Sequence, residues 1–171
     1  MALIAALTLL LDQLTKAWAL RALDGGQARS LVGDAITLRL LHNPGAAFSL
    51  GDSNTVLTTV VAVVVTTAVL LWSRRLGHQL WAWAFGLIVG GSLGNLVDRF
   101  LREPGPGRGH VVDFIDYFGW FVGNIADLAI VGAAIGVAVL TLIGVPVEGH
   151  AAAHARPDGA GTGEAAGHPR P

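Results

Sequence analysis

The sequence predicts an all-α integral membrane protein, a bundle of four transmembrane helices with a small β element in its first long loop. Two observations carry this prediction. The 171 residues are 53% hydrophobic and only 13% charged, whereas a soluble domain has about 25% charged residues. The charged residues also cluster between long apolar runs instead of spreading over amphipathic helix faces. Both features indicate that the bilayer is the main solvent of this chain.

Four apolar segments reach the length of roughly 20 residues that crosses the hydrocarbon core. They span about residues 1–20, 54–72, 80–97 and 124–145. The first could be taken for a cleaved signal peptide, but Asp12 and Lys16 interrupt it and no small-residue cleavage site follows at 18–24. We therefore expect it to be retained as a helix.

Glycines predict how two of these helices pack. Gly86, Gly90 and Gly94 recur at four-residue spacing on the third segment, and Gly132 and Gly136 do so on the fourth. Such small-residue stripes allow neighbouring helix backbones to approach closely in lipid. We expect the third and fourth helices to pack through these glycines.

Tryptophans flank the short turn between the second and third segments, as is typical of a membrane interface; they are Trp72, Trp81 and Trp83.

Four spans leave two longer loops, residues 21–53 and 98–123, on the side opposite both termini. In the first loop, Ala35 to Leu41 has the composition of a strand, and residues 42–45 form a turn signal. Six arginines lie in the two long loops and four on the other side. Taken alone, this count places the long loops in the cytoplasm.

The composition also limits partners and domains. The net charge of −1 gives no basic field for nucleic acid. The chain has no cysteine, which excludes thiolate catalysis and Cys-type zinc sites, and its histidines are not at metal-ligand spacing. We expect neither metal nor cofactor.

Residues 1–147 form the predicted membrane domain. Residues 148–171 are rich in Ala, Gly and Pro, which predicts a disordered tail.

Charged groups at membrane depth are costly, so each one needs a partner or a function. Asp12 and Lys16 are four residues apart on one helix face, where an ion pair would position the helix. Asp98 shares a face with Asn95, so both could point into a polar pocket. Asp98 could equally be a surface residue paired with an arginine such as Arg99.

Asp113 and Asp127 are the two other acids that could carry chemistry. Asp113 lies between apolar residues, and a loop dipping into the membrane would raise its pKa by desolvation. Asp127 follows Asn124 by three residues, which resembles a helix capping box and needs no catalysis. Two carboxyl groups facing one substrate are, however, what hydrolysis of a peptide by activated water requires.

Five sequence blocks point to one family when they are considered together. They are residues 11–16 (LDQLTK), 42–48 (HNPGAAF), 90–99 (GGSLGNLVDR), 111–114 (VVDF) and 124–127 (NIAD). In order and spacing, from about Leu9 to Ala133, the chain resembles the lipoprotein signal peptidases, also called signal peptidase II.

The resemblance implies a bacterial inner-membrane aspartyl endopeptidase, the target of globomycin, that cleaves prolipoproteins before a diacylglyceryl-modified cysteine. It implies that Asp113 and Asp127 are catalytic. The implied substrate pocket comprises Asn43, Asn95, Arg99 and Asn124, with Asp12, Lys16 and Asp98 in supporting roles. Expected partners are modified prolipoproteins and membrane lipid, with the enzyme a monomer. The resemblance places both long loops, with the β element, outside the cytoplasm, against the arginine count, and we follow it.

One departure and two alternatives remain. Gly123 stands where the family usually has an aromatic residue, which affects the packing of the loop before the fourth helix. A non-catalytic membrane component, such as a transporter subunit or assembly factor, would have the same composition. A presenilin-like protease would need a Gly-x-Gly-Asp block, and the sequence has none.

Overall fold

The computed structural model describes residues 1–45 and 55–147. In this part of the chain four helices are long and apolar enough to cross a membrane. They are α1 (Ala2–Ala22), α2 (Thr55–Trp72), α3 (Gln79–Leu101) and α4 (Ile125–Leu142), with a 3-10 turn, η3 (Ser73–Arg75), after α2. Each of the four predicted apolar segments is thus a helix that could cross a membrane. The expected tail at 148–171, like residues 46–54, lies outside the described residues.

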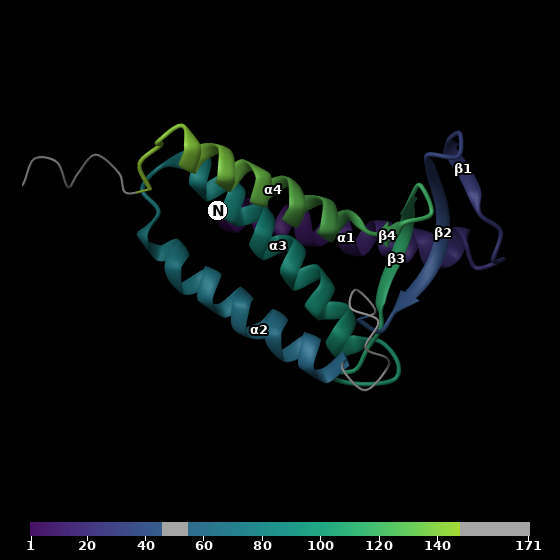
Figure 1. Cartoon of the computed structure of the whole chain (residues 1–171). Helices are drawn as coiled ribbons and strands as arrows, with labels where there is room; N and C mark the ends of the chain where they lie inside the picture. The colour runs from purple at the N-terminus through teal and green to yellow at the C-terminus, as the bar shows by residue number, and fades with distance from the viewer. Residues whose placement is uncertain (46–54, 148–171) are drawn as a thin grey trace, which may run out of the picture.

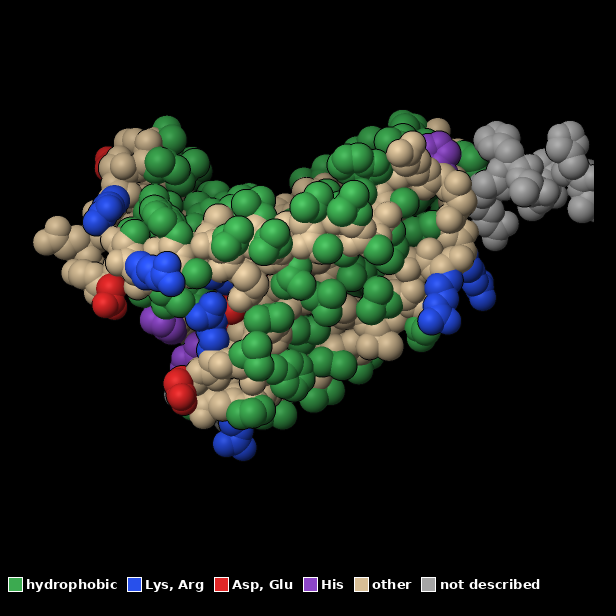
Figure 2. Space-filling view, turned by 180° about the vertical axis from the view of Figure 1, so that it is seen from behind, with side chains coloured by type: hydrophobic (Ala, Val, Ile, Leu, Met, Phe, Trp, Pro, Cys, Tyr) green, Lys and Arg blue, Asp and Glu red, His purple; other side chains and the backbone are tan. Residues whose placement is uncertain are grey.

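Helix α3 is the centre of the bundle, since it packs against α1, α2 and α4. A four-stranded sheet lies at one end of the helices, and the turn between α2 and α3 lies at the other (Figure 1). α3 continues to Leu101 and not to residue 97 as predicted, so that Asp98 and Arg99 are helical residues. Hydrophobic side chains cover the middle of the face shown in Figure 2, and charged ones gather toward its two ends. This distribution matches a bilayer crossed by the helices.

The sheet is antiparallel throughout and has the order β1-β2-β3-β4. Its strands are β1 (Arg29–Val32), β2 (Ile36–Asn43), β3 (Val111–Tyr117) and β4 (Phe121–Gly123). The β element predicted in the first long loop is therefore only half of the sheet. The second loop supplies the other half, and Asp113 lies in a strand instead of a membrane-dipping loop. Most of β3 is buried on both faces, so its sequence lacks the alternation of apolar and polar residues that indicates a half-buried strand.

An apolar contact fixes β3 on the helix bundle. Phe114 is 3% exposed and packs with Ala19 and Leu23 of α1, and its ring meets Trp18 edge to face with centroids 6.2 Å apart. Successive side chains of a strand point to opposite faces. With Phe114 turned toward α1, the neighbouring Asp113 is turned toward the other side, where the polar pocket lies.

The glycine stripe of α3 faces α1 and not α4, so the predicted contact was wrong. A Cβ atom at Gly90 would lie 2.5 Å from the carbonyl oxygen of Ala5, and one at Gly86 would lie 2.8 Å from Cβ of Ile4. Against α4 the close approach is made by Gly91, which neighbours the carbonyl of Ala126. No described atom lies within 4 Å of a Cβ placed at either of the two helix-four glycines, Gly132 and Gly136.

Trp81 is likewise not the interfacial residue that its position predicts. It is 3% exposed, and its indole nitrogen donates a hydrogen bond to the carbonyl of Val145 at 3.2 Å. Trp72 and Trp83 are exposed as expected. Trp81 therefore connects the start of α3 to the chain after α4.

Candidate active site

Asp113 and Asp127 line one pocket of about 260 Å³ at the sheet end of the bundle. Asp113 comes from β3 and Asp127 from the first turn of α4. Three more of the predicted site residues line the same pocket: Asn43, Asn95 and Arg99. Asn124 is fully buried beside it. The structure thus brings together the two carboxyl groups and the four residues expected to bind substrate.

Each oxygen atom of the two carboxyl groups accepts a hydrogen bond. Oδ1 of Asp113 accepts from the side-chain nitrogen of Asn124 at 2.6 Å, and Oδ2 accepts from that of Asn43 at 2.8 Å. Oδ1 of Asp127 accepts from the side-chain nitrogen of Asn95 at 2.9 Å, and Oδ2 accepts from the backbone N–H of Asn124 at 3.1 Å. The four donors that orient the two carboxyl groups are therefore all neutral.

The capping box predicted as a purely structural alternative for Asp127 is present. The side chain of Asn124 accepts from the backbone N–H of Asp127 at 3.0 Å, and Oδ2 of Asp127 accepts in return from Asn124. This cap uses only one oxygen of Asp127. Its other oxygen contacts Asn95, another residue that lines the pocket. Capping the helix and lining the pocket are thus two roles of one side chain.

A buried ionic cluster centred on Lys16 adjoins the pocket. Lys16 is fully buried, and its Nζ lies 2.8 Å from Asp12, 2.8 Å from Asp98 and 2.9 Å from Oδ1 of Asn95. The predicted pair of Asp12 and Lys16 is confirmed. Because Asn95 in turn donates to Asp127, the cluster holds in place a residue that orients one of the two pocket aspartates. We call the pair of Asp113 and Asp127 the dyad.

The carboxylates of this cluster also hold the strand and the last helix in place. Oδ2 of Asp98 accepts from the backbone N–H of Val112 at 3.2 Å, and Oδ1 of Asp12 accepts from that of Ala126 at 3.0 Å. Asp98 is 0% exposed, so its interpretation as a surface acid was wrong. Its arginine partner is Arg102, at 2.6 Å, and not Arg99.

Arg99 connects two loops instead of pairing with the neighbouring acid. Its Nη1 donates to the carbonyl of Asn43 at 3.1 Å and to that of Gly109 at 3.0 Å. The side chain is 8% exposed and lines the pocket. It therefore positions the end of β2, from which Asn43 reaches Asp113.

Burial raises the pKa of Asp113 to about 6. The hydrogen bond from Asn43 opposes this rise, the negative charge of Asp127 adds to it, and the hydrogen bond from Asn124 opposes it. The expectation that desolvation raises the pKa of Asp113 is confirmed. A carboxyl group of this kind can hold a proton close to neutral pH, which an acid catalyst requires.

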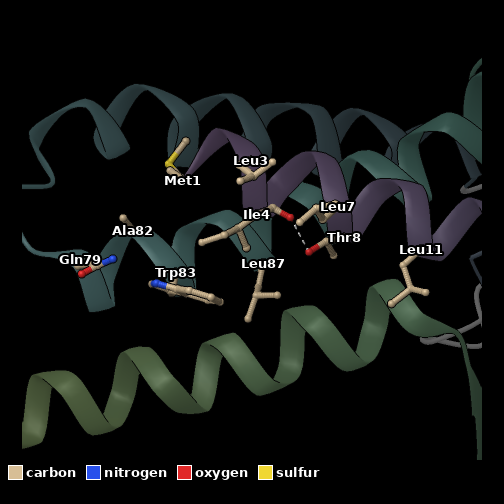
Figure 3. A pocket seen from close by; sticks show the side chains of 10 residues that line it. All are labelled: Met1, Leu3, Ile4, Leu7, Thr8, Leu11, Gln79, Ala82, Trp83 and Leu87. Atoms are coloured by element: carbon tan, nitrogen blue, oxygen red, sulfur yellow. Dashed lines mark hydrogen bonds between the residues drawn. The ribbon is translucent and has the colours of Figure 1, made fainter.

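A second hollow, of about 470 Å³, lies between the starts of α1 and α3 (Figure 3). Its lining is apolar apart from Thr8 and Gln79, and the labelled side chains include Leu3, Leu7 and Trp83. Neither aspartate of the dyad lines it. The candidate site is therefore the smaller and more polar pocket that the two aspartates line.

Sequence analysis missed several residues near the site, including Thr58 and Ala62, which line the pocket. Arg102 lies four positions after Asp98, a helical spacing that could have revealed the pair. Gln13 donates to Asp12 at 3.1 Å and to the carbonyl of Gly94 at 3.1 Å. Phe121 lines the pocket, and no local pattern in the sequence indicated this.

Comparison with known proteins agrees with this geometry. The family model for signal peptidase (SPase) II matches residues 4–143. Lipoprotein signal peptidases from Rhodococcus jostii and Mycolicibacterium smegmatis are 49% and 48% identical over 85% and 82% of the chain, which spans 74% and 60% of their lengths. That from Mycobacterium tuberculosis H37Rv is 45% identical over 82% of the chain and 70% of its own length.

Solved structures support the fold. A bacterial membrane enzyme determined at 1.9 Å resolution has a TM-score of 0.71 and 24% identity, covering 82% of this chain and 90% of its own. A second, at 2.3 Å, has a TM-score of 0.70 and 25% identity, covering 82% and 86%. Fold and site thus define a protein with four membrane-capable helices and two aspartates that line one pocket. The chain belongs to the signal peptidase II family.

Proposed function

We propose that this protein is an aspartyl endopeptidase of the bacterial cytoplasmic membrane that removes the signal peptide from prolipoproteins. Cleavage falls before the diacylglyceryl-modified cysteine. The observation that carries this proposal is that Asp113 and Asp127 line one pocket and both bind Asn124. Membership of the family supports the substrate class.

The two carboxyl groups have different surroundings, which suggests their roles. We assign the acid role to Asp113, since burial raises its pKa to about 6 and so lets it hold a proton close to neutral pH. Asp127 lies in the first turn of α4, where the helix dipole favours a negative charge, and serves as the general base. The pair titrates as a unit, so these roles describe the state that binds substrate.

Hydrolysis then follows in two balanced steps. Asp127 takes a proton from water while the water oxygen bonds to the scissile carbonyl carbon. Asp113 gives its proton to the carbonyl oxygen. The resulting diol collapses when Asp127 returns a proton to the leaving nitrogen and the C–N bond breaks. A diol hydroxyl gives its proton back to Asp113. Both carboxyl groups end in their starting states.

The site lies at the sheet end of the helices, since β3 and the first turn of α4 supply its two aspartates (Figure 1). We place this end on the outer side of the membrane and the η3 turn in the cytoplasm, and we take the enzyme to act as a monomer. Single cysteines test the orientation, because the chain has no native cysteine. An impermeant thiol reagent should label Gln27→Cys in intact cells and leave Gly77→Cys unlabelled. Labelling of Gly77→Cys alone would reverse the orientation.

The activity is tested with purified protein and a prolipoprotein substrate, with and without the diacylglyceryl group. We expect the modified substrate to be cleaved to a product that begins with the modified cysteine, as mass spectrometry would show. The unmodified substrate should persist. Absence of cleavage, or equal cleavage of both substrates, would contradict the proposed function.

A further inference from the structure

The hairpin of β3 and β4 lies between the two aspartates in the sequence, and its second strand brings Phe121 to the wall of their pocket. Phe121 also lines a second pocket, of about 210 Å³. Asp127 is the other residue common to both pockets. The second pocket is completed by Tyr117, Leu128 and Val131. An apolar hollow therefore adjoins the dyad, with the ring of Phe121 at the boundary.

Gly123 creates the space in which this ring lies. A Cβ atom at position 123 would be 2.7 Å from Cε1 of Phe121 and 3.0 Å from Oδ2 of Asp127. The first distance is shorter than real Cβ contacts allow, so a side chain at 123 would displace the ring. Tyr117 pairs with Phe121 across the strands, and their rings stack at 20° with centroids 6.2 Å apart. The ring thus has a defined position that depends on glycine at 123.

The apolar hollow is accessible from the bilayer. Leu128 is 49% exposed and Val131 is 58% exposed, and both belong to α4, one of the four helices that could cross the membrane. Exposed apolar side chains on such a helix face lipid. A group that enters this hollow from the hydrocarbon region would lie beside Asp127, which lines both pockets.

We propose that Phe121 is a specificity-determining residue whose ring separates the dyad from an acyl-chain subsite formed with Tyr117, Leu128 and Val131. This rests on the proposed function, in which a lipid-bearing cysteine adjoins the scissile bond. Such a substrate needs a hydrocarbon site beside the carboxyl groups, and the two pockets meet at Phe121 and Asp127. One acyl chain occupies the apolar pocket while the peptide bond lies against the dyad.

The test compares two substrates with the same peptide, one carrying two long acyl chains and one carrying two short chains. Wild type should prefer the long-chain substrate in kcat/KM. In Phe121→Ala this preference should fall at least about tenfold. Even one methylene group in an apolar pocket changes kcat/KM by about that factor, and the ring is larger. The loss should appear in KM for the long-chain substrate. Trp120→Ala is the matched control, because Trp120 is the adjacent aromatic residue, is 92% exposed and lines neither pocket.

A second variant approaches the subsite from the helix side. Leu128→Trp keeps the hairpin intact and fills the pocket, so it should weaken cleavage of the long-chain substrate and spare the short-chain one. Unchanged chain-length preference in both variants would overturn the subsite while leaving the proposed function in place. A change in preference for the residue before the cysteine, without a change for chain length, would also overturn it. Failure of wild type to cleave either substrate would remove the proposed function and the subsite with it.

Discussion

The side-chain nitrogen of Asn124 lies 2.6 Å from Oδ1 of Asp113, so the residue that caps α4 is bound directly to the carboxyl group on β3. The same side chain accepts from the backbone N–H of Asp127. One asparagine therefore sets the position of one aspartate relative to the other.

Replacing either aspartate by asparagine should abolish proton transfer while keeping the shape of the side chain. We expect Asp113→Asn and Asp127→Asn each to lower turnover by at least about a hundredfold, the range in which a general acid or base contributes. The double variant should be scarcely worse than either single one, because residues that act as a unit are not additive. Cleavage of the modified prolipoprotein measures this. Asp34→Asn, an exposed acid in the β1–β2 turn, is the control.

A graded loss across several acids, instead of a near-total loss at two, would favour the non-catalytic alternative. If Asp113→Asn kept more than about a tenth of wild-type turnover, above what loss of a general acid permits, the dyad would need reassignment. Asp98 would then not be the first alternative, because it lies in the ionic cluster with Lys16 and Arg102 and does not line the pocket.

The pH dependence of activity should respond to Asn43. Its hydrogen bond to Asp113 lowers a pKa that burial has raised to about 6, so Asn43→Ala should raise that pKa further. Because the protonated form of Asp113 is the active one, activity falls as pH rises through this value. The descending limb of the kcat/KM profile, which reports the free enzyme, should therefore move to higher pH in Asn43→Ala. A shift to lower pH would contradict the assignment of Asp113 as the acid.

Stability should also depend on the proton at Asp113. The pKa in the folded protein, about 6, is above the ordinary value of 3.8, so the folded state binds a proton that the unfolded state has released. The stabilisation is complete below about pH 4 and is lost as pH rises through about 6, in total at most about 3 kcal/mol. Melting temperatures in detergent between pH 4 and 7 should show this slope for wild type. The slope should be smaller in Asp113→Asn, and an equal slope in both proteins would contradict the shift.

The ionic cluster should matter for stability more than for chemistry. Lys16→Met leaves Asp12 and Asp98 buried without their common cation, and breaking a buried pair costs about 3 to 5 kcal/mol. Asp98→Asn should lower the melting temperature but retain measurable turnover. Thermal unfolding in detergent together with the cleavage assay separates these effects. Turnover lost in a fully stable Asp98→Asn protein would assign Asp98 to the reaction.

Two glycine substitutions should have opposite consequences. A Cβ atom at Gly94 would collide with the carboxyl group of Asp12, whereas no described atom lies within 4 Å of one at Gly132. Gly94→Ala should therefore lower the melting temperature. Gly132→Ala should leave it unchanged or raise it, since alanine is favoured over glycine in a helix by about 1 kcal/mol. Equal effects of the two substitutions would contradict the packing of α3 on α1.

The sequence was sufficient for the four helices because apolar length alone identifies a span. It was also sufficient for the pair of Asp12 and Lys16, whose spacing is local. It was insufficient for β3, because a strand buried on both faces loses its alternation. The partner of the glycine stripe was mistaken for a related reason, since a stripe shows that a close contact exists but does not identify the other helix.

Some features of the candidate site could likewise be predicted from the sequence, and others could not. Resemblance to the family supplied the residues, and the capping box could be read from the spacing of Asn124 and Asp127. The link from Asn124 to Asp113 spans two elements, and the contact of Phe121 with Gly123 depends on side-chain direction. Such relationships are determined by tertiary packing and leave no periodic signal. Arg102 is the exception, because its four-residue separation from Asp98 was visible.

The position of Asp127 on α4 has a consequence for biogenesis. A membrane protein is inserted as it is synthesised, and α4 is the last of the four spans to leave the ribosome. Until then Asp113 has neither Asp127 nor the amide of Asn124, and Asp12 has no backbone N–H from Ala126. On the proposed assignment, a nascent or prematurely terminated chain contains no functional dyad. On this assignment, proteolytic activity begins only when the fourth span has been inserted.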